Sequence, residues 1–205
     1  MSAPAEARPA KRTYQPEDLE AMEANGYAYE IGDCGQLEER GLSWLTGNVS
    51  AEVLMRFGIF NHSHSLGHVF TGEVGIRAWP ARPRRFRRVD AGFISSARAP
   101  QGYPTWLTVA PDLAVEVVSP GDDATTLVRK VFEYIEAGSR LVWTIYPERG
   151  MAVVFRADGT TTVVRYDGAL DGEDVLPGFT MSLAEIMPDP STFEDPDDSG
   201  DGPER

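Results

Sequence analysis

The pattern of hydrophobic and polar residues along the chain predicts both helices and strands. Helices are predicted where apolar residues recur every three or four positions, and strands where short apolar or alternating runs lie between turn residues. The predicted helices begin at Pro16, at Asn48 and at Asp122 or Asp123, and the third ends at Gly138. The predicted strands cover residues 27–31, 68–79, 87–95, 113–119 and 140–147, and a hairpin covers 150–168 with its turn at Asp158-Gly159.

The order of these elements favours an α/β fold with one mixed β-sheet flanked by helices. Residues 113–146 read as strand, helix, strand, which is the pattern of a right-handed crossover between parallel strands. We expect one domain over residues 14–187. The Ala/Pro-rich segment 1–13 and the acidic segment 188–205 are predicted to be disordered tails.

Composition narrows the class of protein further. No apolar run approaches the roughly 18 residues of a membrane span, and no apolar segment follows the basic residues near the start, as a secretory signal would require. The single cysteine, Cys34, excludes a disulfide framework and a cysteine-rich zinc site. We therefore expect a cytoplasmic protein.

The charge is unevenly distributed. The formal net charge is −13, and seven acidic residues lie within 188–205. Residues 82–88, in contrast, hold five arginines and no acid: Arg82, Arg84, Arg85, Arg87 and Arg88. Because like charges repel, this stretch predicts either a solvated loop or a contact with an anionic partner such as nucleic acid.

A carboxylate in the middle of an apolar strand is the first sign of chemistry. Glu116 lies between Val115 and Val117, and a buried carboxylate needs a cation or hydrogen-bond donors. Asp112 lies on the same strand face, but four residues of strand span about 13 Å, too far for two ligands of one metal ion. The second acid is expected from a neighbouring strand, and Asp90 is the natural candidate.

Lysine usage gives an independent indication. Only two of the 19 basic residues are lysines, Lys11 and Lys130, and Lys11 is in the predicted tail. The folded part therefore uses arginine for its positive charges except at position 130. Lys130 borders the apolar stripe of the helix that follows the Glu116 strand, so its ammonium can point back toward Glu116.

Two acids and a lysine can hydrolyse a phosphodiester. The acids can hold Mg²⁺ or Mn²⁺, which lowers the pKa of a bound water and offsets phosphate charge. The ammonium of Lys130 can orient that water or stabilise the transition state. The alternative is an internal salt bridge between Glu116 and Lys130, and spacing alone does not separate the two interpretations.

The chain resembles the Uma-two family of restriction endonucleases, within the PD-(D/E)XK nuclease superfamily. The resemblance covers roughly residues 16–187. It is carried by "YAYEIGD", "RRVDAGFIS", "PDLAVEVVSP", "RKVFEYIEAG", "LVWTIYP" and "DVLPGFTMSLAEI". It implies a restriction-endonuclease-like fold, a Mg²⁺ or Mn²⁺ cofactor and DNA as the partner. It also implies that Asp90 and Glu116 bind the metal with the carbonyl of Val117, and that Lys130 is a catalytic lysine moved from the strand to the next helix.

The chain departs from the family pattern at two positions. Val89 replaces the proline that precedes the aspartate, and Val118 stands where the superfamily lysine is common. An acid from an early segment often completes such sites. Glu30 and Glu52 are the candidates for it here, and for each of them the alternative is an ordinary polar residue of the surface. The literal "PD" at 111–112 is expected to be a decoy.

No other motif in the sequence indicates a metal-binding or phosphate-binding site. The histidines at 62, 64 and 68 lack the spacing of a zinc motif, and no phosphate-binding glycine loop is present. We therefore expect a metal-dependent endonuclease that cuts DNA with Asp90, Glu116 and Lys130, and whose five arginines contact phosphates. The alternatives are a non-catalytic interaction protein that keeps the nuclease fold and a phosphodiesterase acting on a small nucleotide. The sequence leaves open whether the protein is a monomer or a homodimer.

Overall fold

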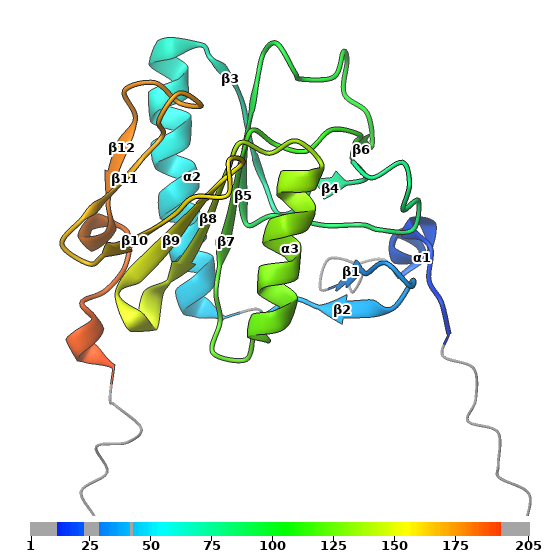
Figure 1. Cartoon of the computed structure of the whole chain (residues 1–205), viewed down its shortest axis with the longest axis horizontal. Coiled ribbons are helices and arrows are strands. Elements are labelled where there is room, and N and C mark those ends of the chain that lie inside the picture. Colours follow the sequence, from blue (N-terminus) through cyan, green and yellow to red (C-terminus); the bar gives the residue numbers. More distant parts are fainter. Residues whose placement is uncertain (1–11, 23–28, 42, 194–205) are drawn as a thin grey trace, which may run out of the picture.

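The computed structural model describes residues 12–22, 29–41 and 43–193, and its centre is a six-stranded mixed sheet (Figure 1). The strands lie in the order β10-β9-β8-β7-β5-β3. Strands β7 and β8 are parallel, and each other pair of neighbours is antiparallel. Their bounds are β3 Gly67–Thr71, β5 Ala91–Ser95, β7 Leu113–Val117, β8 Leu141–Tyr146, β9 Met151–Arg156 and β10 Thr161–Arg165. The prediction of a mixed α/β fold is confirmed.

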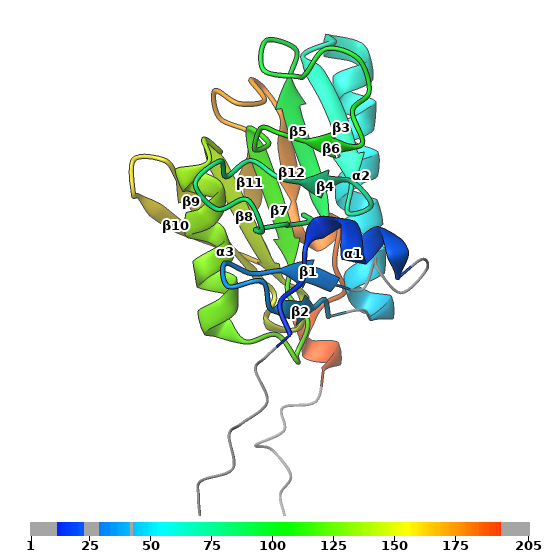
Figure 2. The same ribbon diagram turned by 90° about the vertical axis from the view of Figure 1, so that its right-hand side faces the viewer.

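Helix α2 (Trp44–His64) covers one face of the sheet and helix α3 (Ala124–Glu136) covers the other, as Figures 1 and 2 both show. Helix α2 packs Val49, Val53 and Phe57 on the face that carries Leu113 and Val115 of β7. This larger core cluster also includes Trp143 of β8. The odd-numbered residues of β7 therefore face α2.

Helix α3 packs on the even-numbered face of β7. Its residues Val131 and Tyr134 share a core cluster with Ala114 of β7 and Val142 of β8. Because side chains alternate along a strand, Glu116 projects from the same face as Ala114 and lies beneath α3. The fold thus places the carboxylate against the helix that carries Lys130.

Local sequence fixes where α3 begins and ends. The side chain of Asp123 accepts a 2.7 Å hydrogen bond from the Thr126 N–H and caps the N-terminus. Gly138, with a φ of +102°, turns the chain after the last helical turn. The helix joins the parallel strands β7 and β8, as the strand–helix–strand pattern predicts.

Smaller elements surround this core. Helix α1 (Pro16–Ala21) and the antiparallel pair β1 (Tyr29–Ile31) and β2 (Leu37–Glu39) pack around Leu19, Ile31 and Phe86 and lie beyond one end of the sheet (Figure 2). The other pairs and 3-10 turns are β4 (Gly75–Ile76) with β6 (Trp106–Leu107), β11 (Ala169–Asp171) with β12 (Thr180–Ser182), η2 (Pro147–Arg149), η3 (Leu183–Glu185) and η4 (Pro190–Thr192).

Three predicted boundaries are wrong. The strand predicted over 68–79 is interrupted by a turn and forms β3 and β4. The segment 87–90 is not part of the main sheet, because the backbone of Arg87 pairs with Ile76 and that of Phe86 with Ile31. Helix α2 starts at an N-cap on Ser43, whose side chain accepts the Thr46 N–H at 3.1 Å, and not at Asn48.

The predicted tails lie largely outside the described residues. Where the structure describes their inner ends, the guanidinium of Arg12 lies 4.7 Å from the ring centroid of Tyr14, and Pro190–Thr192 form the 3-10 turn η4. Residues 23–28 of the predicted first helix and strand are also outside the description. None of the described helices is both long enough and apolar enough to cross a membrane.

Candidate active site

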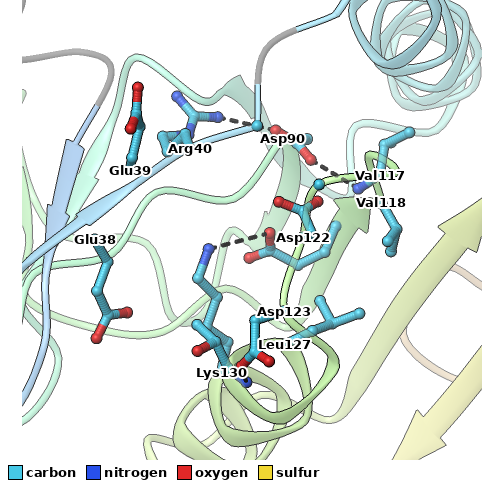
Figure 3. A pocket seen from close by; sticks show the side chains of 14 residues that line it. Glu38, Glu39, Arg40, Asp90, Val117, Val118, Asp122, Asp123, Leu127 and Lys130 are labelled. Atoms are coloured by element: carbon cyan, nitrogen blue, oxygen red, sulfur yellow. Dashed lines mark hydrogen bonds and ion pairs between the residues drawn. The ribbon is translucent and has the colours of Figure 1, made fainter.

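The fold brings Asp90, Glu116 and Lys130 to one pocket of about 260 Å³. Figure 3 labels Asp90 and Lys130 among the side chains that line it. The pocket lies where β7 ends, between the segment after β2 and the first turns of α3. Its lining includes the two acids, the lysine, Arg40 and Val117, and further residues from these segments: Glu38, Glu39, Gly41, Val118, Gly121, Asp122, Asp123, Thr126 and Leu127. Residues far apart in sequence thus form one polar cavity.

Asp90 lies opposite Glu116 across two neighbouring strands. Ala91 of β5 pairs with Val115 of β7 in antiparallel register, and Asp90, which directly precedes β5, donates its N–H to the Val115 carbonyl at 2.9 Å, so it meets the residue that follows Val115 on β7. One oxygen of Asp90, Oδ2, accepts the Val117 N–H at 2.7 Å, and the other, Oδ1, lies 2.9 Å from Nη2 of Arg40. Burial raises the pKa of Asp90, against the opposing effect of these two partners.

Glu116 is buried and has neutral and charged partners. Its Oε1 accepts a 2.9 Å hydrogen bond from the hydroxyl of Tyr134, and its Oε2 lies 3.8 Å from Nζ of Lys130. Burial raises the pKa of Glu116 to about 8. The negative charges of Asp90 and Glu30 add to this rise, whereas the Lys130 ammonium opposes it. Glu116 therefore takes up a proton readily while no further cation is bound.

Lys130 makes its shortest ion pair with Glu30, at 2.8 Å from Nζ to Oε2. Glu30 is fully buried, yet Lys130 and Arg87 outweigh burial and lower the pKa of its carboxyl. The structure thus places Glu30 of β1 against Lys130, although Glu30 is not itself among the residues that line the pocket. It leaves Glu52 on α2, where that residue pairs with Arg56 one helical turn away and does not line the pocket.

Three of the five arginines at 82–88 are buried, namely Arg85, Arg87 and Arg88, so the solvated loop that the sequence offers as one explanation is wrong for them. Arg87 is 0% exposed and binds Glu133 through Nε at 2.6 Å and Glu38 through Nη1 at 2.7 Å. Arg85 binds Asp33 at 2.5 Å, and Arg88 donates from Nη1 to the Glu73 carbonyl at 2.7 Å.

Arg82 and Arg84 are exposed. Of the five arginines that the sequence suggests for phosphate contacts, these two have the exposure that such contacts require. The acids that neutralise the buried arginines come from distant parts of the chain, which a charge count over seven residues does not reveal.

The chemistry of the pocket fits a hard divalent cation. Asp90, Glu116 and the carbonyl of Val117 offer oxygen ligands, which Mg²⁺ and Mn²⁺ prefer. Burial, with the negative charges of Asp90 and Glu30, keeps the pKa of Glu116 raised despite the Lys130 ammonium, and a further cation beside it would favour the charged carboxylate. Within residues 12–22, 29–41 and 43–193, no three His, Cys, Asp or Glu side chains are arranged to hold a metal ion.

Asp112 has a structural environment away from the pocket. Its carboxylate accepts the Ser95 N–H at 2.8 Å and binds Arg98 Nη1 at 2.8 Å. Of the three histidines, His64 stacks on Phe60 with ring centroids 3.9 Å apart. Asp112 and His64 therefore have partners elsewhere in the fold, and neither of them lines the pocket.

Sequence reasoning missed Arg40 and Tyr134 as neighbours of the two acids. Tyr134 is predicted as a core residue, and its hydroxyl could have been noticed because it lies one helical turn after Lys130. Arg40 gives no comparable signal, since it is 50 residues from Asp90 and belongs to no regular element.

The fold is that of a nuclease-like α/β protein. The chain superimposes, with a TM-score of 0.72, on the crystal structure of "a putative nuclease belonging to DUF820" from Anabaena variabilis, over 84% of this chain and 96% of that one. The two sequences are 15% identical, so the likeness is one of fold.

Residues 16–184 match the model of the Uma2 (Uma-two) family, described as "Putative restriction endonuclease", and the chain belongs to this family. The resemblance seen in the sequence is confirmed. No curated protein matches this sequence.

The pKa of Glu116 predicts the pH dependence of stability in metal-free buffer. The folded-state pKa, about 8, lies above the ordinary value of 4.5, so the folded protein binds this proton more tightly than the unfolded one. The free energy of unfolding should therefore fall as pH rises from about 4.5 to 8, by on the order of a few kcal/mol. Glu116→Gln, which keeps an acceptor for Tyr134, should flatten this slope in urea unfolding with EDTA.

The matched control is Glu52→Gln, the same exchange at an acid that does not line the pocket. It should keep the wild-type slope. A Glu116→Gln slope equal to that of the wild type would contradict the raised pKa.

Arg87 should be a stability determinant. Arg87→Gln removes the closest cation from Glu133 and from Glu38, leaving Arg85 at 3.6 Å from Glu133 and Arg129 at 2.9 Å from Glu38. It should lower the free energy of unfolding by about 3 kcal/mol in urea titrations. Arg84→Gln, at an exposed arginine of the same stretch, should change it by less than about 0.5 kcal/mol. Equal effects of the two exchanges would show that the buried network does not stabilise the fold.

Proposed function

We propose that this protein is a metal-dependent endonuclease that hydrolyses phosphodiester bonds of DNA. The observation that carries the proposal is the meeting of Asp90, Glu116 and Lys130 in one pocket. Each comes from a different place in the fold: the segment leading into β5, the strand β7 and the helix α3. Membership of a family described as "Putative restriction endonuclease" supports the same reaction class.

In this proposal Asp90, Glu116 and the Val117 carbonyl hold Mg²⁺ or Mn²⁺. When bound, the ion supplies a water of lowered pKa and offsets charge on the phosphate. The backbone N–H of Val117 orients Asp90 through its 2.7 Å hydrogen bond to Oδ2. Lys130 lines the same pocket, and Glu30, which does not line it, holds the Lys130 ammonium at 2.8 Å.

Lys130 is then placed to stabilise the charge that develops on the phosphate. A preorganised cation in a partly buried pocket is worth more than in water, because little solvent screens it. The Lys130 side chain is 14% exposed, so it is screened by protein yet open to the cavity. Glu39, Asp122 and Asp123 are exposed residues of the pocket lining, so the pocket opens to solvent beside them.

A non-catalytic protein with the nuclease fold is the second candidate, and one observation favours it. Lys130 is closer to Glu30, at 2.8 Å, than to Glu116, at 3.8 Å, and both pairs are internal. Such an arrangement also satisfies a purely structural ion network. The two candidates differ in what they predict when lysine is exchanged for arginine.

Lys130→Arg should keep the fold but lose most cleavage of supercoiled plasmid in Mn²⁺. An arginine can pair with both carboxylates through its planar fork, yet it is bulkier and is aimed differently at a phosphate. Losing one charge stabiliser of this kind costs on the order of 10²–10³ in rate. Plasmid nicking, with circular dichroism to verify folding, measures the effect.

The matched control is the reverse exchange at the neighbouring residue, Arg129→Lys, which alters the ion pair with Glu38 at the pocket rim. It should cleave at the wild-type rate. Plasmid cleavage unaffected by Lys130→Arg would favour the structural role. Cleavage of dinucleotide phosphodiesters in place of plasmid would indicate a small-nucleotide phosphodiesterase.

A further inference from the structure

Arg40 makes its contact with Asp90 at the oxygen that a metal ion would need. Of the two oxygens of Asp90, Oδ2 accepts the Val117 N–H at 2.7 Å. Oδ1 lies 2.9 Å from Nη2 of Arg40 (Figure 3). Both side chains line the pocket and are largely buried, with 14% of Arg40 and 22% of Asp90 exposed.

The guanidinium of Arg40 sits in a space built for it. A Cβ atom at Gly72 would lie 2.6 Å from Nη2 of Arg40 and 3.0 Å from the Val89 carbonyl oxygen, so a side chain at this position would displace the guanidinium. Arg40 Nη1 also approaches the Gly72 carbonyl at 3.4 Å. Absence of a side chain at position 72 thus lets the arginine reach Asp90.

Arg40 is charged and can therefore act as the counter-ion of Asp90. Burial alone would lower its pKa, but the carboxylates of Asp90, Glu30 and Glu116 raise it, so the guanidinium stays charged. Two positive centres cannot share one carboxylate oxygen without mutual repulsion. A divalent cation carries twice the charge of arginine and approaches oxygen at about 2.0–2.6 Å, which is closer than the guanidinium does.

We propose that Arg40 is a positioning residue that occupies the cation position at Asp90 in the metal-free protein, and that a divalent metal ion binds by displacing it. Arg40 then orients Asp90 before the metal arrives and lowers the apparent metal affinity of the site. The inference rests on the proposed function, because it requires that Asp90 binds a divalent cation.

Mn²⁺ binding to the full-length protein, followed by calorimetry, tests the proposal without any activity assay. Arg40→Gln should bind Mn²⁺ about tenfold to a hundredfold more tightly than the wild type, since the metal no longer has to break a charged hydrogen bond. Arg129→Gln removes one positive charge that pairs with Glu38, a residue of the pocket lining, without touching Asp90, and should change the affinity by less than about threefold.

Gly72→Ala tests displacement at constant charge. It keeps Arg40 but places a methyl group where the guanidinium lies, so Mn²⁺ should again bind more tightly than to the wild type. Arg40→Lys keeps a cation that can reach toward Asp90 and should bring the affinity back toward the wild-type value. A general effect of charge on the pocket would instead leave the Mn²⁺ affinity of Gly72→Ala at the wild-type value, because that variant keeps every charge.

Thermal melting supplies a second readout. In EDTA, Arg40→Gln should melt below the wild type because Asp90 loses its counter-ion, and saturating Mn²⁺ should abolish the difference. A difference that persists in Mn²⁺ would show that arginine and metal coexist on Asp90, and would overturn the inference. The inference would also be overturned if Arg40→Gln bound Mn²⁺ no more tightly than the wild type does. The same holds if Arg129→Gln gained as much Mn²⁺ affinity as Arg40→Gln.

Asp90→Asn separates failure of this inference from failure of the proposed function. The exchange should abolish Mn²⁺ binding if Asp90 is a ligand. A wild-type protein that binds no Mn²⁺, or binds it equally well as Asp90→Asn, overturns both the metal site and the displacement. Binding that depends on Asp90 but is not tightened in Arg40→Gln overturns the displacement alone.

Discussion

The compensation of buried carboxylates at the end of β7 is the constraint on which the rest of the structure depends. Glu116 lies in a central strand under a helix, where an unpaired negative charge is costly. Asp90 and Glu30 bring two more carboxylates to the same place. Three elements that are distant in sequence must supply the cations and donors: the segment after β2, the stretch before β5, and α3. The elements that form the pocket are therefore also the ones that neutralise it.

Arg87 shows how stability and site geometry are joined. It holds Glu133 of α3 and Glu38 of β2 in the protein interior, and it reaches Glu30 at 3.4 Å. Glu30 in turn holds Lys130. Buried ion pairs of this kind give little net stability compared with apolar packing, but they are strongly directional, and removing one partner is expensive. The network fixes where the β1–β2 pair meets α3, and so fixes the wall of the pocket.

The sequence predicts what depends on local pattern. Alternation in 113–119 and the apolar stripe of 124–136 give β7, α3 and the face from which Glu116 projects, and strand adjacency places Asp90 opposite it. The arginines at 82–88 show the limit. Their charges look unbalanced locally, and their partners, such as Glu133, lie some 46 residues away. The choice between Glu30 and Glu52 also depends on such contacts, since both are acids beside apolar residues and only the fold separates them.

The identity of the residue at 130 follows from the balance of these charges. Glu30 has close cations in Lys130 and Arg87, at 2.8 and 3.4 Å, and Asp90 has Arg40 at 2.9 Å. Glu116 has the weakest ion pair of the three, at 3.8 Å, and a hydroxyl at 2.9 Å. An arginine at 130 could bridge Glu30 and Glu116 with its two-pronged head and complete the neutralisation. The compact ammonium of lysine leaves Glu116 under-compensated and the cavity beside it open, which suits a site that receives a further cation and disfavours a network selected for stability alone.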